Sequence, residues 1–118
     1  MYNEDFTTED ELALIKNTLI EIAEGILGHT YAQPKSISLL CLNFKINCDQ
    51  FGKLMIEFTL LEKKGNLDLE KFKNVVMQVC PQAHDIIDDN FVKSLIKAYA
   101  FCYLEDLRDF ADTLTIKF

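Results

Sequence analysis

The chain has 118 residues, of which 12 are Lys or Arg and 19 are Asp or Glu, so its formal net charge is −7. With 49% hydrophobic and 26% charged residues, it has the composition of one folded domain and is neither disordered nor fibrous. A domain of this size can bury a core without disulfides or a metal. We therefore expect a single domain over residues 1–118.

The start of the chain is acidic and lacks the basic start and apolar run of a secretory signal. Charged or amide residues interrupt every apolar run before it reaches the roughly 18 residues that a membrane span needs. We therefore expect a cytoplasmic protein with no membrane partner. In a reducing compartment, cysteines that match no disulfide or zinc spacing usually behave as small buried hydrophobes. Core positions are expected for Cys41, Cys48, Cys80 and Cys102.

Charge is distributed unevenly along the chain. Residues 1–24 carry a net charge of −6 and residues 85–118 one of −3, whereas residues 35–73 carry +2. Direct binding of DNA or RNA needs a dense basic face that displaces counterions. The two acidic thirds argue against nucleic acid as a partner and favour rapid encounter with a basic protein.

The first predicted helix begins near Thr8, which has the spacing of a capping box with Glu11. Gly28 is a plausible left-handed stop. Apolar residues between these points recur at helical spacing and form one stripe. The stripe consists of Leu12, Ile15, Leu19, Ile22, Ala23 and Ile26.

Residues 36–64 fit two periods. Alternation of apolar residues would give a hairpin over residues 37–61, and thus an α+β fold. Helical spacing fits the same residues. The ending Lys63, Lys64 and Gly65 is typical of a helix C-terminus. We therefore expect a helix over about residues 50–64, and leave residues 37–46 open with a preference for helix.

Asp68 is expected to cap the next helix, which Pro81 closes. The longest helix is predicted to start at Asp88 or Asp89 and to run to about Asp112. Its apolar residues recur at steps of three and four. They are Val92, Leu95, Ile96, Tyr99, Tyr103, Leu107 and Phe110.

The tail over residues 113–118 alternates and is rich in β-branched residues, so it is either a short strand or an extended end packed on the core. Four or five helices joined by short loops predict a mainly α fold, a compact four- or five-helix bundle. The α+β fold with the hairpin over residues 37–61 is the alternative.

Catalytic and metal-binding patterns are weak. Cys80 and His84 are four residues apart, but Pro81 separates them and no Cys-x-x-Cys pair accompanies them. The sequence has no nucleophile elbow, phosphate loop or dinucleotide-binding glycine pattern. We expect no catalytic residue, cofactor or metal, and an enzyme that uses carboxylates and His84 with a metal is the least favoured alternative.

The most informative pattern lies on the last predicted helix. Opposite its apolar stripe, helical geometry gathers acidic side chains around Phe101, and an aromatic anchor with a charged rim is typical of protein-binding hot spots. The alternative is that Phe101 packs under the tail or against residues 37–46 while the acids only aid solubility. A second acidic cluster precedes this helix, where capping explains at least one residue. The predicted partner-binding residues are Phe101, Glu105, Arg108, Asp109, Asp112, Asp85, Asp88 and Asp89.

These patterns favour a non-catalytic protein that binds and inhibits a basic partner, such as a toxin, a nuclease or another nucleic-acid-processing enzyme. Its carboxylates would stand where phosphates lie. In small size, acidity and helical pattern the chain resembles antitoxin, immunity and phage-inhibitor proteins, a likeness of composition that no motif carries. The alternative function is a helical small-molecule-binding or regulatory adaptor module, with Tyr99, Tyr103 and the phenylalanines as its pocket lining.

Overall fold

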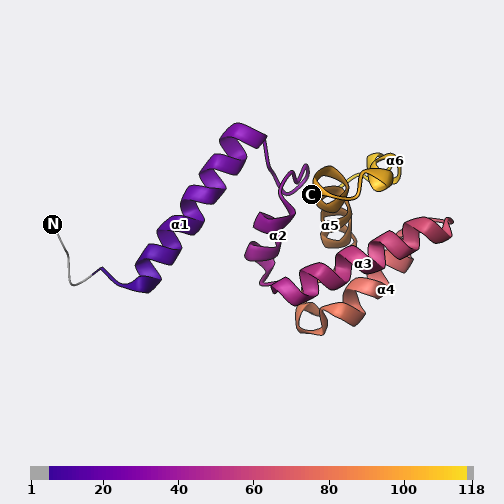
Figure 1. Ribbon diagram of the computed structural model, residues 1–118, viewed down its shortest axis with the longest axis horizontal. Helices are drawn as coiled ribbons and strands as arrows, with labels where there is room; N and C mark the ends of the chain where they lie inside the picture. Colours follow the sequence, from indigo (N-terminus) through magenta and orange to yellow (C-terminus); the bar gives the residue numbers. More distant parts are fainter. Residues whose placement is uncertain (1–5, 117–118) are drawn as a thin grey trace.

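Helices account for the regular structure of residues 6–116, which are the residues that the computed structural model describes (Figure 1). The α-helices are α1 (Thr8–Ile22), α2 (Ile37–Phe44), α3 (Cys48–Lys64), α4 (Leu69–Val79), α5 (Asp89–Cys102) and α6 (Arg108–Asp112). Shorter turns are the π-helical η1 (Ala23–Leu27) and the 3₁₀ segments η2 (Pro81–Ala83) and η3 (Glu105–Leu107). The prediction of a mainly α helical bundle is confirmed.

The predicted β structure is wrong wherever the structure describes the chain. The hairpin expected as an alternative over residues 37–61 is replaced by α2 and α3, and residues 113–116 form no strand. The rest of the predicted tail, residues 117–118, lies outside the described residues. The Ser36 hydroxyl caps α2 by accepting a hydrogen bond from the backbone N–H of Leu39, and a left-handed Lys45 with φ of 58° ends the helix.

Helices α1, α4 and α5 begin directly after residues whose side chains cap them. Asp68 and Asp88 are the N-caps of α4 and α5, as predicted. The capping box of α1 lies one residue earlier than expected, because Thr7 and Asp10 exchange side-chain and backbone hydrogen bonds of 3.1 and 3.0 Å. The two threonines, at positions 7 and 8, are each followed three residues later by an acid, and use of the earlier pair lengthens the helix by one residue.

Helix α5 is the centre of the bundle and contacts α2, α4, η3 and α6. Tyr99 is fully buried on it, and its hydroxyl donates a 2.7 Å hydrogen bond to the backbone carbonyl of Phe51 on α3. The Tyr99 ring also meets the buried Phe58 ring edge to face, with centroids 5.3 Å apart. This contact and hydrogen bond tie α3 to the central helix.

The long helix predicted over residues 88–112 is wrong in its second half, because α5 ends at Cys102 and the chain turns back. The backbone N–H groups of Tyr103 and Leu104 both bond to the Tyr99 carbonyl, at 2.8 and 2.7 Å. A straight helix of this length would extend about 37 Å, past the end of the bundle. The turn instead lets Leu107 and Ala111 become buried beside α5.

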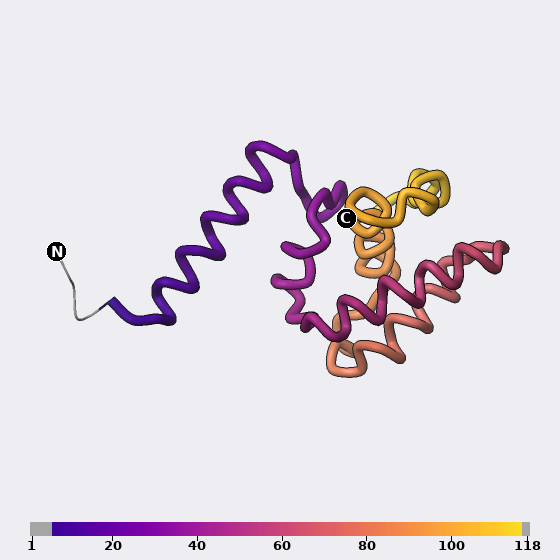
Figure 2. Tube along the Cα trace, in the orientation of Figure 1, coloured from indigo at the N-terminus to yellow at the C-terminus, as the bar shows by residue number. Residues whose placement is uncertain are grey.

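Helix α1 projects away from the other helices, which gives the molecule a longest dimension of 58 Å (Figure 2). None of its residues is buried. The predicted apolar stripe is present, but Leu12, Ile15, Leu19, Ile22 and Ile26 are between 47% and 77% exposed, and only Ala23 is buried. The bundle is therefore built from α2 to α6, with α1 outside it.

Replacing Tyr99 with Phe tests the buried hydrogen bond at the centre of the bundle. The variant removes the side-chain hydroxyl that donates to the Phe51 carbonyl, so the free energy of unfolding should fall by about 1–2 kcal/mol. The urea midpoint measures this change. Tyr103→Phe is the matched control, because this tyrosine is exposed and its hydroxyl has no hydrogen-bond partner within residues 6–116. Equal loss of stability in both variants would contradict the assignment.

Candidate protein-interaction surface

The predicted partner-binding residues fall into two groups at opposite ends of α5. Asp85, Asp88 and Asp89 lie at its start, and Phe101 lies in its last turn. Because the helix has 14 residues, these ends are about 20 Å apart. The structure therefore does not bring the two groups together into one site.

The first group has structural roles at the start of α5. The Asp88 carboxylate accepts a 2.7 Å hydrogen bond from the Phe91 N–H as the helix N-cap. Asp89 forms an ion pair of 3.2 Å with Lys73 of α4, and the exposed Asp85 lies 3.8 Å from His84. Capping accounts for Asp88 and pairing between helices for Asp89, whereas Asp85 is exposed and has neither role.

Phe101 remains 47% exposed, so the chain covers only about half of its surface. It lies at a hollow of about 310 Å³ between the 32–35 connector, α5 and α6. The side-chain nitrogen of Lys35 lies 5.8 Å from the ring centroid, within cation–π range. The Phe101 ring at the surface is thus in contact with Lys35, which comes from a distant part of the chain.

The charges that line this hollow differ from the acidic ring expected from the sequence. Its charged residues are Lys35, Lys97, Arg108 and Asp112. Lys97 donates to the Ala111 carbonyl at 2.8 Å, which helps to hold α6 against α5. The sequence did not point to Lys35, because it comes from a distant connector. Lys97 was overlooked although its i, i+4 spacing with Phe101 places both residues on one face of α5.

Arg108 fastens the segment that follows α5. Its guanidinium donates to the carbonyls of Ala100 and Phe101 at 3.1 and 3.2 Å, and these carbonyls belong to the last turn of α5. A cation at a helix C-terminus also suits the helix dipole. Glu105 lies 3.9 Å from the same guanidinium. Arg108 is therefore a structural clamp as well as a predicted site residue.

Four exposed carboxylates follow Phe101 on η3 and α6, and we call them the acidic edge. Arg108 is the only cation among residues 105–112, so this segment carries a net charge of −3. A continuous helix would have turned Asp106 to another face, which is why the sequence analysis did not select it. The acidic edge consists of Glu105, Asp106, Asp109 and Asp112.

The cysteines and His84 offer no metal centre in the part of the chain that the structure describes, where no group of three or more His, Cys, Asp or Glu side chains could hold an ion. Cys41 and Cys80 are buried, as expected, and burial raises the pKa of Cys41 to about 12. Cys48 and Cys102 are exposed, so the expected core positions are wrong for these two.

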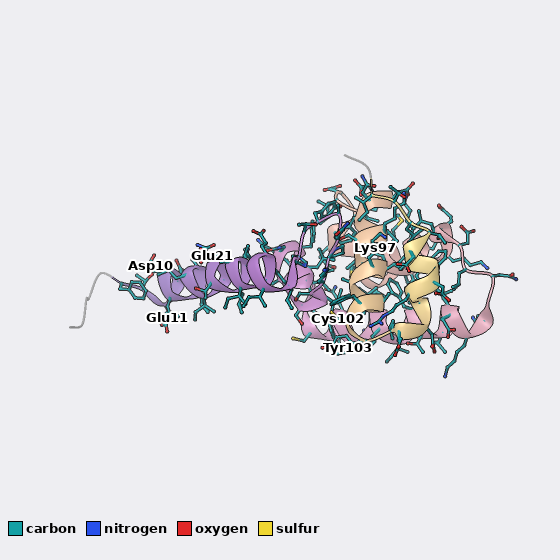
Figure 3. All side chains as sticks on the ribbon, turned by 90° about the horizontal axis from the view of Figure 1, so that it is seen from above. Asp10, Glu11, Glu21, Lys97, Cys102 and Tyr103 are labelled. Atoms are coloured by element: carbon teal, nitrogen blue, oxygen red, sulfur yellow. The ribbon has the colours of Figure 1, made fainter. Side chains whose placement is uncertain are left out.

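Side chains on α1 form a second accessible surface. Figure 3 shows Asp10, Glu11 and Glu21 along the projecting helix, whereas Lys97, Cys102 and Tyr103 lie on the bundle. The sequence revealed the apolar stripe of α1 but gave no sign that the chain would leave it uncovered. The exposed large apolar residues of α1 and η1 are Leu12, Leu14, Ile15, Leu19, Ile22, Ile26 and Leu27.

The chain matches no family model, no curated protein and no solved structure. Within residues 6–116, no helix is both long and apolar enough to cross a membrane. The acidic edge, the Phe101 hollow and α1 are the accessible surfaces that point to a function.

The connector between α1 and α2 is fastened by the buried His29. Its Nδ1 accepts hydrogen bonds from the backbone N–H groups of Lys35 and Ser36, at 2.9 and 3.2 Å. Burial lowers the pKa of His29 below its ordinary value of 6.5, while the nearby Glu24 acts in the opposite direction. Neutral His29 thus holds the backbone that carries Lys35 to the Phe101 hollow.

Acidification should weaken this connector. Because the pKa of His29 is lower in the folded chain, the unfolded chain takes up the proton first as the pH falls below 6.5. The urea midpoint should therefore fall between about pH 7.5 and about pH 5.5. In His29→Asn, an amide oxygen can accept in place of Nδ1 without titrating, so the change should be smaller. An unchanged pH dependence in the variant would contradict this role.

Proposed function

We propose that this protein is a non-catalytic interaction protein that binds a basic protein and blocks its functional surface. The observation that carries the proposal is the half-exposed Phe101, whose hollow is lined by Asp112 of the acidic edge, together with the net charge of −3 on the exposed segment 105–112. In many protein interfaces a few aromatic residues, surrounded by a polar rim, contribute most of the binding free energy. The fit is best for a partner that presents Lys or Arg to the acidic edge and an apolar side chain to Phe101.

The clamps around Phe101 support this function because they reduce the ordering needed on binding. The ring is approached by Lys35, and Arg108 and Lys97 hold α6 against α5 through backbone carbonyls. A surface that is already ordered loses less conformational entropy when a partner docks. The carboxylates can therefore be presented at fixed positions to the cations of a partner.

The class of partner follows from charge. A net charge of −7 attracts basic proteins over distance and speeds their encounter. Toxins, nucleases and other nucleic-acid-processing enzymes carry basic surfaces where phosphates bind, and carboxylates of the acidic edge would compete for the same cations. Inhibition would thus be by occlusion, without any chemical step.

A second candidate function is binding of a small anionic ligand in the Phe101 hollow. Its volume of about 310 Å³ is at the lower end of the range for ligand sites, and three cations line it. The sequence-based version of this idea, with Tyr99 and Tyr103 lining one pocket, does not fit, because Tyr99 is fully buried in the core and Tyr103 is exposed. Thermal-shift measurements with small phosphates and carboxylates separate this function from protein binding.

Two substitutions test the proposed function once a partner has been captured at low salt and identified. Phe101→Ala should leave folding intact and weaken the complex by about 2 kcal/mol, which is roughly a thirtyfold rise in Kd, mainly through faster dissociation. Asp109→Lys should slow association most at low salt. Surface plasmon resonance at two salt concentrations measures both effects.

Ile56→Ala is the control for Phe101→Ala, because Ile56 is also an exposed apolar residue, at 61%, but lies on α3 and does not line the Phe101 hollow. It should bind like the unaltered protein. A captured partner that is not basic, or equal affinity of the Phe101→Ala and Ile56→Ala variants, would contradict the proposal. Unfolding of Phe101→Ala would show that Phe101 belongs to the core.

A further inference from the structure

The exposed stripe of α1 has the spacing of a coiled-coil seam. Its residues follow one another at steps of three, four, three and four, the spacing of the a and d positions of a heptad repeat. All are at least 47% exposed. The seam consists of Leu12, Ile15, Leu19 and Ile22 on α1 and of Ile26 on the π-helical η1 that follows.

A helix of this length needs contacts beyond its own hydrogen bonds. Helix α1 has 15 residues and none of them is buried, and isolated helices of about 12–15 residues are only marginally stable in water. The seam would also leave apolar surface in contact with water along the whole helix. A second molecule that covered the seam would account for both the stability of α1 and its exposed apolar face.

The charges beside the seam identify that molecule. With Leu12 at an a position, Glu11 occupies g and Lys16 occupies e. In a parallel pair of helices, a g residue meets the e residue five positions later on the other helix. Glu11 of each copy would therefore meet Lys16 of the other, and neither side chain forms an ion pair within residues 6–116 of its own chain.

The opposite orientation is disfavoured by the same two residues. In an antiparallel pair with full overlap of the seam, Lys16 would meet Ala23 and Glu11 would meet Gly25 of the other helix, so neither residue would gain an ion pair. Lys16 is the only cation on α1, so no other basic residue could compensate. We propose that α1 pairs in parallel and in register with α1 of a second copy of this chain.

The hollow between α1 and α2 supports this pairing. It has a volume of about 340 Å³ and is mainly apolar. Leu19 and Ile22 of the seam line one side, and Leu39 and the exposed Leu42 of α2 line the other, so this part of the seam borders the space between α1 and α2. Figure 2 shows the open angle between the two helices. In a two-fold pair the same patch on each copy meets the other, and the second α1 would cover Leu42 as well as the seam.

The pairing of α1 does not depend on the proposed binding of a basic protein, but it changes how many acidic edges one particle presents. The acidic edge lies on η3 and α6, which are not part of the seam or of the α1–α2 hollow. A pair of chains would therefore carry two such edges and could bind two partners, or one two-fold partner with higher avidity.

Sedimentation velocity of the full chain between about 1 and 100 μM tests the pairing, since this range brackets the affinity of many weak dimers. We expect a dimer that dissociates on dilution. Leu19→Asp puts a charge into the seam and should weaken dimerisation roughly a hundredfold or more. Leu14→Asp is the matched control, because Leu14 is also about half exposed on α1 but occupies a c position off the seam.

Charge exchange tests the parallel register. Glu11→Lys and Lys16→Glu each turn two attractive contacts into repulsive ones, so each should weaken the dimer roughly tenfold. The double variant restores opposite charges and should recover most of the affinity. A monomer at all concentrations, equal effects of Leu14→Asp and Leu19→Asp, or no recovery in the double variant would overturn the proposal. Urea midpoints of the bundle verify that every variant is folded.

Discussion

Burial of α5 on nearly every side is the constraint that organises this molecule. Helices α2 and α4 cover it, Tyr99 ties it to α3, and η3 and α6 return along it after the turn at residues 103–104. Eight of its 14 residues are buried by the other helices, so its apolar face is covered without α1. The bundle is therefore complete without α1, and the apolar seam of that helix remains on the surface.

The same constraint shapes both candidate surfaces. Because α5 stops at Cys102, Arg108 can bond to its last carbonyls and hold the acidic edge beside Phe101. Because α1 is excluded, its seam is available to another chain. The two surfaces differ in chemistry, since one combines a single aromatic ring with carboxylates and the other is a long apolar stripe. This difference suits the first to a basic partner and the second to a copy of itself.

Local signals in the sequence were sufficient for most helix boundaries. Asp68, Asp88 and Gly28 mark helix ends through caps and left-handed backbone, interactions that involve only neighbouring residues. Non-local effects were not predictable. The turn after Cys102 has no Gly or Pro and depends on packing against α5, and Lys35 reaches Phe101 from a distant connector. Periodicity likewise shows that one face of α1 is apolar but cannot show what covers it.

The central claim is that the bundle of α2–α6 is complete without α1, and that α1 is stabilised by a second chain. Hydrogen exchange of the full chain at high and low protein concentration tests it most directly, because amide protection reports the local free energy of opening. The account predicts that dilution speeds exchange in α1 while exchange in α5 stays the same. Exchange in α1 that does not depend on concentration, or loss of protection in both helices together, would contradict it.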